Sequence, residues 1–433
     1  MLIAAAGGSV HEMERLLFAV LLQLVIIVLF ARLSGVAAQR LGQPLVVGEI
    51  IGGLLLGPSL FGRLAPDLFE YVFLYPPAGP SMQILSQIGL VLLMFQIGLD
   101  FDFSHLRKTQ NRRAVIGVSV GGVALPFVVG FWIGHISAPH LAPDIDRLAY
   151  ALFVATAFSI TAIPILGRIM IEFGLTRTRL GAVAISAAAI NDVVGWVLLA
   201  VITAMTMAQF SSIGMLRQIA LLALYTTVCW FIVKPLLQRL IGYYQVRSDW
   251  LPSNLMVIVI GCVFASAIAT YKLGIFAIFG GFMIGILLYE KQTFVEAWNN
   301  KVADFVTVFF LPIFFTYTGL RTNVNGLDSV TLWLWCAVMI GGATFGKFAA
   351  AYVAARWAGM AHHESSCLGI MMNTRALMEL VILNVGYELG VIPPNVFTML
   401  VLMAIVSTIV TAPLLRVWLP KMGHPVPRPV GRE

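Results

Sequence analysis

The sequence predicts an all-α polytopic membrane protein with about 13 transmembrane helices. Hydrophobic residues make up 60% of the 433 residues and charged residues only 11%, against about 25% in an ordinary soluble domain. So few charges could not cover a soluble fold of this size, which argues against a soluble enzyme, a nucleic-acid-binding protein and a disordered scaffold. The net charge of +7 is better explained by basic loops on one side of a membrane.

Thirteen apolar segments approach the length of about 20 residues that a helix needs to cross a bilayer. We therefore expect one membrane transport domain over residues 1–433, with its spans between residues 15 and 418. Residues 419–433 are expected to form a short cytoplasmic tail, without a soluble regulatory domain. The expected spans are 15–33, 44–60, 82–100, 114–135, 149–170, 180–207, 214–236, 252–271, 274–290, 305–320, 329–357, 365–389 and 394–418.

Lysine and arginine residues are distributed unevenly among the segments between these spans. With the N-terminus outside, the internal segments hold 19 of the 27 basic residues, the external segments six and the spans two. Basic residues accumulate on the cytoplasmic side of membrane proteins. This bias predicts an external N-terminus and a cytoplasmic C-terminus.

Two spans are interrupted by polar or helix-breaking residues. The fifth span contains the interruption at residues 156–164, and the twelfth contains Gly369 followed by Asn, Thr and Arg at 373–375. The two spans are seven apart in order, so they cross the membrane in opposite directions. Paired interrupted helices of opposite direction indicate an inverted repeat, with the substrate site where they cross.

Five ionisable side chains lie within the apolar spans, where each costs about 2.5–3.5 kcal/mol on insertion scales. They are Glu49, Asp192, Lys347, Arg375 and Glu379. Asp192 is the only acidic residue of the sixth span. Burial disfavours its charged form, so this carboxylate is suited to exchange a proton for a small cation. The alternatives are a neutral, hydrogen-bonded structural acid and an acid that pairs with Lys347.

Several oxygen-bearing side chains are candidates to bind a cation together with Asp192. Thr161 and Ser159 offer hydroxyl groups at the fifth-span interruption, beside unwound backbone carbonyls. Because hard cations prefer oxygen ligands, we expect a monovalent cation at Asp192 and Thr161. Asn191 could orient a neighbouring group or only satisfy a helix contact. The alternative for the hydroxyls is a hydrogen bond back to their own helix.

The other four intramembrane charges have less direct interpretations. Lys347 lies too deep in the eleventh span for snorkelling, and is expected either to neutralise the negative ends of broken half-helices or to pair with Asp192. Arg375 and Glu379 are four residues apart, so mutual pairing along one helix face is favoured. Glu49 is either an entrance residue or a half-solvated structural acid.

Separated motifs in these segments resemble, in order, those of the monovalent cation:proton antiporter-2 family. The plant cation/proton exchangers and their bacterial relatives are the most similar members, and the resemblance covers residues 15–418. The motifs are QPLVVGEIIGGLLLGPS at 43–59, GLDFD at 98–102, the interruption at 159–164 with LGR at 166–168, ND at 191–192, FFTYTGLRTN at 314–323 and NTRALMEL at 373–380.

The resemblance implies an inverted-repeat antiporter of the sodium/proton antiporter type. It further implies a homodimer in a bacterial inner membrane, with a core domain that moves past a dimerisation domain. Na⁺ or K⁺ would exchange for H⁺, with Asp192 as the shared carrier and Lys347 as the core lysine. Asn191 stands where electrogenic relatives have the first of two acids, so the resemblance favours electroneutral exchange. Lys347 leaves an alternative open, because relatives with a titrating lysine can move a second proton. Beyond the transported ions, no cofactor is implied.

Two other function classes agree less well with the sequence. A sodium-coupled symporter of an organic anion could use the same fold, with Arg375 to bind the anion, but the deep acid Asp192 argues against it. A membrane-embedded enzyme is disfavoured because all seven histidines lie in loops or at helix ends and HExxH is absent. The expected partners are therefore a monovalent cation, the proton, the lipid bilayer and a second copy of the chain, and no nucleic acid.

Overall fold

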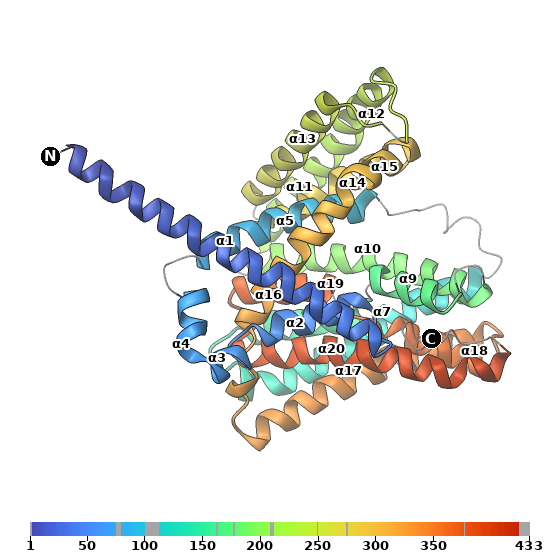
Figure 1. The fold of residues 1–433 in the computed structure, drawn as a ribbon. Coiled ribbons are helices and arrows are strands. Elements are labelled where there is room, and N and C mark those ends of the chain that lie inside the picture. Colours follow the sequence, from blue (N-terminus) through green and yellow to red (C-terminus); the bar gives the residue numbers. More distant parts are fainter. Residues whose placement is uncertain are drawn as a thin grey trace. The chain divides into compact units, whose positions relative to one another are not determined.

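The computed structural model describes residues 2–74, 79–99, 112–161, 163–175, 178–207, 212–248, 250–273, 276–375 and 377–423, and these residues fold almost entirely into helices (Figure 1). Across these ranges no β-strand is formed, and the only β-type pairing is an isolated bridge between Arg247 and Trp250. The all-α prediction is therefore confirmed. Most of the expected tail, from residue 424 onward, lies outside the described residues.

Many of the helices are long and apolar enough to cross a membrane. Within the described residues nine helices meet this criterion, and a helix pair bent by 46° raises the number to ten. Three further apolar helices are shorter, with 10–17 residues. Each of the 13 predicted spans contains a helix, so the polytopic membrane fold is confirmed. The number of 13 crossings stays a prediction.

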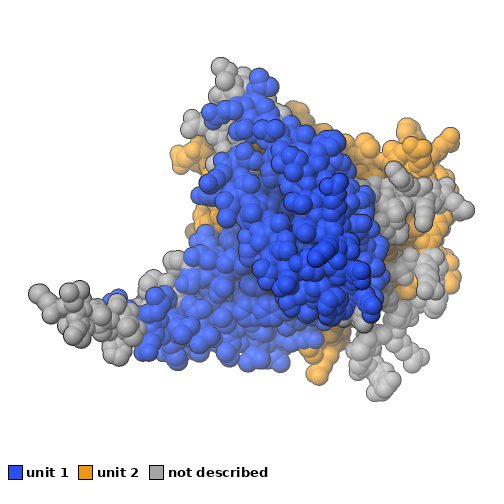
Figure 2. All heavy atoms as spheres, turned by 90° about the horizontal axis from the view of Figure 1, so that it is seen from above, with its two compact units in different colours: residues 1–34, 49–102, 216–321 blue, residues 35–48, 103–215, 322–433 orange. Residues whose placement is uncertain are grey.

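The chain divides into two compact units, which Figure 2 colours separately. Unit 1 comprises residues 1–34, 49–102 and 216–321, and unit 2 comprises residues 35–48, 103–215 and 322–433. Each unit is thus assembled from three stretches that alternate along the chain. Neither unit is an independent linear segment, and the expectation of one transport domain stays a prediction.

Unit 1 packs some of its helices backbone against backbone. Its helices include parts of α1 (Leu2–Arg40), α2 (Leu45–Leu55) and α11 (Ser212–Val228), together with α3 (Phe61–Leu64), α4 (Pro66–Phe69), α5 (Gly79–Leu99), α12 (Lys234–Tyr243), α13 (Ser253–Lys272), α14 (Ala277–Leu288), α15 (Gln292–Trp298), α16 (Leu311–Arg321) and the π-helical turns Glu70–Leu74, Cys229–Val233, Asn299–Ala303 and Val306–Phe310. A Cβ atom at Gly281 of α14 would lie 2.3 Å from the carbonyl oxygen of Val91 in α5. Small residues at such crossings let membrane helices approach closely.

Unit 2 contains both interrupted spans. Its helices are the end of α1, the starts of α2 and α11, α7 (Arg112–Leu141), α8 (Arg147–Ser159), α9 (Ile163–Glu172), α10 (Arg179–Met207), α17 (Val330–Trp357), α18 (His362–Met372), α19 (Leu377–Glu388), α20 (Pro394–Trp418) and the 3₁₀ turns Val324–Gly326 and Pro420–Met422. Cβ atoms at Gly130 and Gly134 of α7 would each lie 2.8 Å from the Cα atom of an alanine in α8. This close approach fixes α8, which ends at the first interruption.

Both interruptions are breaks between two half-helices, as predicted, but Gly369, which was expected to interrupt the twelfth span, lies inside α18 (His362–Met372). α8 begins where the Asp146 side chain accepts a hydrogen bond from the backbone N–H of Ala149 at 2.8 Å, and it ends because Ile160 adopts an extended backbone (φ −90°, ψ 150°). Pro164 falls in the first turn of α9, where the missing N–H is tolerated. α18 ends at Met372 and α19 begins at Leu377. The inverted-repeat relation between the two broken spans stays a prediction.

Candidate functional site

The two breaks meet inside unit 2. The hydroxyl of Thr161, in the first break, donates a hydrogen bond of 2.9 Å to the backbone carbonyl of Met372, the last residue of α18. Thr161 and Met372 are both fully buried. This bond brings the C-terminal ends of the half-helices α8 and α18 together, so the two breaks are in contact; their crossing in opposite directions stays a prediction.

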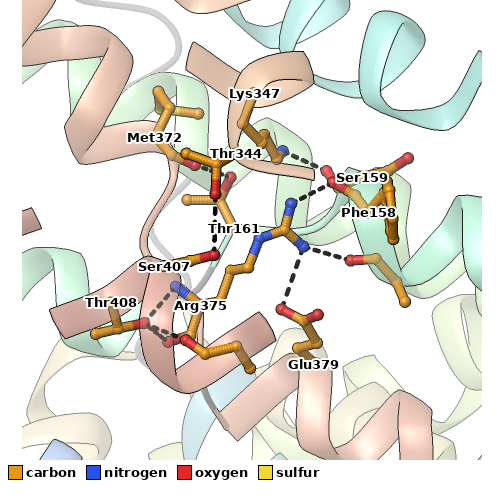
Figure 3. A network of polar contacts seen from close by, with 12 residues as sticks. Phe158, Ser159, Thr161, Thr344, Lys347, Met372, Arg375, Glu379, Ser407 and Thr408 are labelled. Carbon is orange, nitrogen blue, oxygen red and sulfur yellow. Dashed lines mark hydrogen bonds and ion pairs between the residues drawn. The ribbon is translucent and has the colours of Figure 1, made fainter. Parts of the chain in front are cut away.

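Arg375, from the second break, caps the C-terminus of α8. Its Nη1 atom donates to the carbonyl of Ala157 at 2.6 Å, and its Nη2 atom donates to the carbonyl of Phe158 at 2.7 Å (Figure 3). The last carbonyls of a helix have no partner within the helix, and that end carries a partial negative charge. A guanidinium group therefore satisfies both the hydrogen bonds and the charge.

Lys347, from α17, places a second cation at the same helix end. Its Nζ atom donates to the carbonyl of Gly122 in α7 at 2.6 Å and to the carbonyl of Ser159, the last residue of α8. The side chain is fully buried. Of the two interpretations of Lys347, these contacts agree with neutralisation of a broken half-helix. A hydrogen-bonded pair with Asp192, the other interpretation, is not formed.

Arg375 also forms the predicted ion pair with Glu379. The two side chains, Nη1 to Oε2, are 3.2 Å apart and almost completely buried. The break around Arg375 is further held by Thr408 of α20, whose hydroxyl accepts a hydrogen bond from the Arg375 backbone N–H at 3.0 Å and contacts its carbonyl. Thr408 was not among the residues predicted from the sequence. The sequence feature that could have pointed to Thr408 is a group of hydroxyl residues in an otherwise apolar span, namely Ser407, Thr408 and Thr411.

Asp192 differs from these residues because its carboxylate has no hydrogen-bond partner among the described residues. It lies in α10 and is 1% exposed, and both of its oxygens are unpaired. Asn191 and Asn373 are completely buried, and both amide atoms of each also lack a partner. An unpaired buried polar group costs about 1–3 kcal/mol, and in native proteins such groups call for a functional explanation or a bound ion or water.

Asn191 and Asp192 lie close to the anchor of Lys347. A Cβ atom at Gly122 would be 3.2 Å from Nδ2 of Asn191, and the carbonyl of the same glycine accepts a hydrogen bond from Lys347. Asn191, the neighbour of Asp192 in sequence, therefore lies beside the glycine that anchors Lys347.

The other predicted residues are placed less directly. The hydroxyl of Ser159 donates to the carbonyl of Ala155 at 2.7 Å, which is a bond to its own helix, so its role as a ligand stays a prediction. Glu49 is 7% exposed and belongs to unit 1, whereas the other candidates belong to unit 2. Residues 100–102 of the GLDFD motif lie outside the described residues.

The buried ionisable side chains of the site fall into two groups, those with hydrogen-bond partners and one, Asp192, without a partner in the part of the chain that the structure describes. Lys347, Arg375 and Glu379 are engaged by backbone carbonyls and by each other, so their charges are compensated within the protein. Asp192 retains two free oxygens in a low-dielectric surrounding, where a bare carboxylate is costly. Chemically, such a group is stabilised by taking up either a proton or a small cation.

Comparison with known proteins supports the resemblance seen in the sequence. The family described as "Sodium/hydrogen exchanger, transmembrane" matches residues 25–419. The Na(+)/H(+) antiporter NhaS4 of Synechocystis sp. is 37% identical over 94% of this chain and 99% of its own length. Cation/H(+) antiporter 17 of Arabidopsis thaliana is 34% identical over 93% of this chain, which spans about half (49%) of that relative.

A solved structure shares the fold at low sequence identity. The sodium/proton antiporter MjNhaP1 from Methanocaldococcus jannaschii, determined at pH 8, matches with a TM-score of 0.63 and 16% identity, over 94% of this chain and 98% of that one. Because the family match extends over most of the sequence and the Synechocystis relative is matched over nearly its full length, the chain belongs to the sodium/hydrogen exchanger family.

Proposed function

We propose that this chain is a secondary antiporter that exchanges a monovalent cation, Na⁺ or K⁺, for H⁺ across the membrane. The observation that carries the proposal is the Asp192 carboxylate, which is buried and has two unpaired oxygens beside side chains whose charges are already compensated. Membership of the sodium/hydrogen exchanger family and the antiporter relatives support the same function.

In this proposal the proton and the cation compete for Asp192. One carboxylate can hold either ion, so binding of the cation releases the proton, and binding of the proton releases the cation. The transporter alternates between two states and exposes Asp192 to one side at a time. A carboxylate that carries neither ion keeps an uncompensated charge in a low-dielectric surrounding, so the empty form does not change state. This restriction couples the two fluxes.

Thr161, Asn191 and Ser159 are proposed to complete the cation site with Asp192. Asn191 has an unpaired side-chain oxygen, and the oxygen of Thr161 keeps lone pairs while its hydroxyl hydrogen is donated to Met372. Oxygen donors of this kind suit a hard cation. The roles of Lys347 and Arg375 are to hold the C-terminal end of α8 in place and to compensate its negative charge.

We further propose one-for-one, electroneutral exchange, because a single acid is available in α10 and Asn191 replaces a second one. The chain would act as a homodimer in a bacterial inner membrane. Its N-terminus would lie outside, because the distribution of basic residues favours that orientation. An organic-anion symporter is not favoured. The Arg375 guanidinium that would bind the anion is already engaged by two carbonyls and by Glu379.

Transport in proteoliposomes tests the proposal. The wild-type chain should exchange Na⁺ or K⁺ for H⁺, and Asp192→Asn should abolish the exchange while the protein remains folded. Asn at this position keeps the size of the side chain but cannot bind a proton or carry the charge. Exchange by Asp192→Asn at the wild-type rate would refute Asp192 as the carrier.

An imposed membrane voltage tests the stoichiometry separately. Moving one net charge through 100 mV is worth about 2.3 kcal/mol, so an electrogenic cycle must respond strongly. The electroneutral cycle proposed here should proceed at the same rate with and without the voltage. A strong voltage response would refute one-for-one exchange and would leave the antiporter proposal itself intact.

A further inference from the structure

A cavity of about 430 Å³ lies between α17 and α20, within unit 2. Eight residues line it, and none of these eight is charged. The cavity is open at the protein surface, because Phe345 on α17 is 67% exposed and Val406 and Val410 on α20 are each 36% exposed. Its volume falls in the range of about 300–1,000 Å³ that is typical of ligand sites.

The position of this cavity along α17 places it at the centre of the bilayer. Its lining on α17 runs from Ile340, ten residues after the helix begins, to Phe348, nine residues before the helix ends. At 1.5 Å per residue these points lie about 14 Å from the helix ends. The hydrocarbon core of a bilayer is about 30 Å thick. The molecules that reach this opening are therefore hydrocarbon chains.

Two of the residues that line the cavity carry hydroxyl groups, and these two groups are hydrogen-bonded to each other. Thr344 and Ser407 are joined by a hydrogen bond of 3.4 Å (Figure 3), so an occupant need not supply a polar group. Ser407 directly precedes Thr408, which holds the backbone of Arg375 at the second break. An occupant of the cavity would therefore border the segment that positions the capping cation of α8.

We propose that the α17–α20 cavity is a binding site for one acyl chain of a membrane lipid. An apolar chain fits its charge-free lining and its depth, whereas a lipid head group finds no cation there. A stable contact with a second protein copy usually involves about 20–30 residues a side, far more than the eight that line this cavity. The bound chain gains van der Waals contacts that would otherwise be missing in the cavity.

Gly341 provides a variant that fills this site. A Cβ atom there meets nothing within 4 Å, so Gly341→Leu occupies the cavity without pushing on the backbone. Gly261, in α13, has equally open surroundings and does not line the cavity. Gly261→Leu is therefore a matched control for the effect of a new leucine on a membrane helix.

Photo-crosslinking in vesicles tests the proposal on the full chain. The probe is phosphatidylcholine with a diazirine at the middle of one acyl chain, present as a trace in phosphatidylcholine vesicles, and the adducts are mapped by peptide mass spectrometry. We expect adducts at Phe345 and Val406 to exceed those at Leu125 and Val128, which are exposed near the middle of α7 and do not line the cavity. Gly341→Leu should lose the cavity adducts, and Gly261→Leu should keep them.

Two outcomes would overturn the proposal. Cavity adducts no more frequent than those at Leu125 and Val128, or adducts that persist in Gly341→Leu, would show that no acyl chain is held there. Because labelling requires no ion transport, neither result depends on the proposed antiport, and gel filtration of both variants verifies that they are folded.

Discussion

Removing the Arg375 side chain tests how the first break is held. Arg375→Leu deletes the donors to the carbonyls of Ala157 and Phe158 and leaves Glu379, which is 1% exposed, without its cation. Breaking a buried ion pair by removing one partner costs about 3–5 kcal/mol. We expect Arg375→Leu to lower the free energy of unfolding by that amount.

The variant Glu379→Gln provides the comparison for this prediction. It keeps the guanidinium on both α8 carbonyls and loses one charged hydrogen bond, worth about 1.5–3 kcal/mol. The double variant Arg375→Leu/Glu379→Gln should recover part of the loss, because the stranded carboxylate is gone. Denaturant titration of the purified chain in detergent, followed by tryptophan fluorescence, measures all three. A loss in Glu379→Gln equal to that in Arg375→Leu would refute the capping role.

Three further predictions concern packing, the second break and pH. Gly134→Ala should lower the free energy of unfolding by about 1–3 kcal/mol, because the new methyl group overpacks α7 against α8. Gly261→Ala, in open surroundings, should raise the free energy of unfolding by about 0.5–1 kcal/mol. The same denaturant titration measures both variants. Thr408→Val should cost about 1–3 kcal/mol because the Arg375 N–H loses its acceptor, and Thr227→Val, at an exposed site, should cost little. Because protons compete with the cation for Asp192, the apparent KM for the cation should rise by up to about tenfold for each unit fall in pH. Flux assays with the same pH on both sides of the vesicle membrane measure this KM. A KM that does not change with pH would contradict a shared site.

The sequence predicted those parts of the fold that depend on local patterns. Apolar runs identified the membrane helices, because a bilayer requires about 20 apolar residues for each crossing. Helix-breaking residues identified both breaks, and the spacing of four identified the Arg375–Glu379 pair, because residues four apart face each other on a helix.

Contacts between distant segments were not predictable in the same way. Lys347 donates to carbonyls that are 225 and 188 residues away in sequence, and no local pattern distinguishes these acceptors from Asp192. The role of Thr408 was missed for a related reason, since its partner Arg375 lies on another element. The choice among partners depends on which side chains pack against glycines such as Gly122, beside which the Asn191 side chain lies, and tertiary structure alone reveals this.

Proton release upon cation binding measures the central claim most directly. When Na⁺ or K⁺ is added to purified protein in weakly buffered detergent solution, the wild-type chain should release protons, because the cation displaces them from Asp192. Glu379→Gln should behave in the same way, since Glu379 is held by Arg375. Asp192→Asn should release none. Cation-dependent proton release by folded Asp192→Asn would contradict the assignment of Asp192 as the shared carrier.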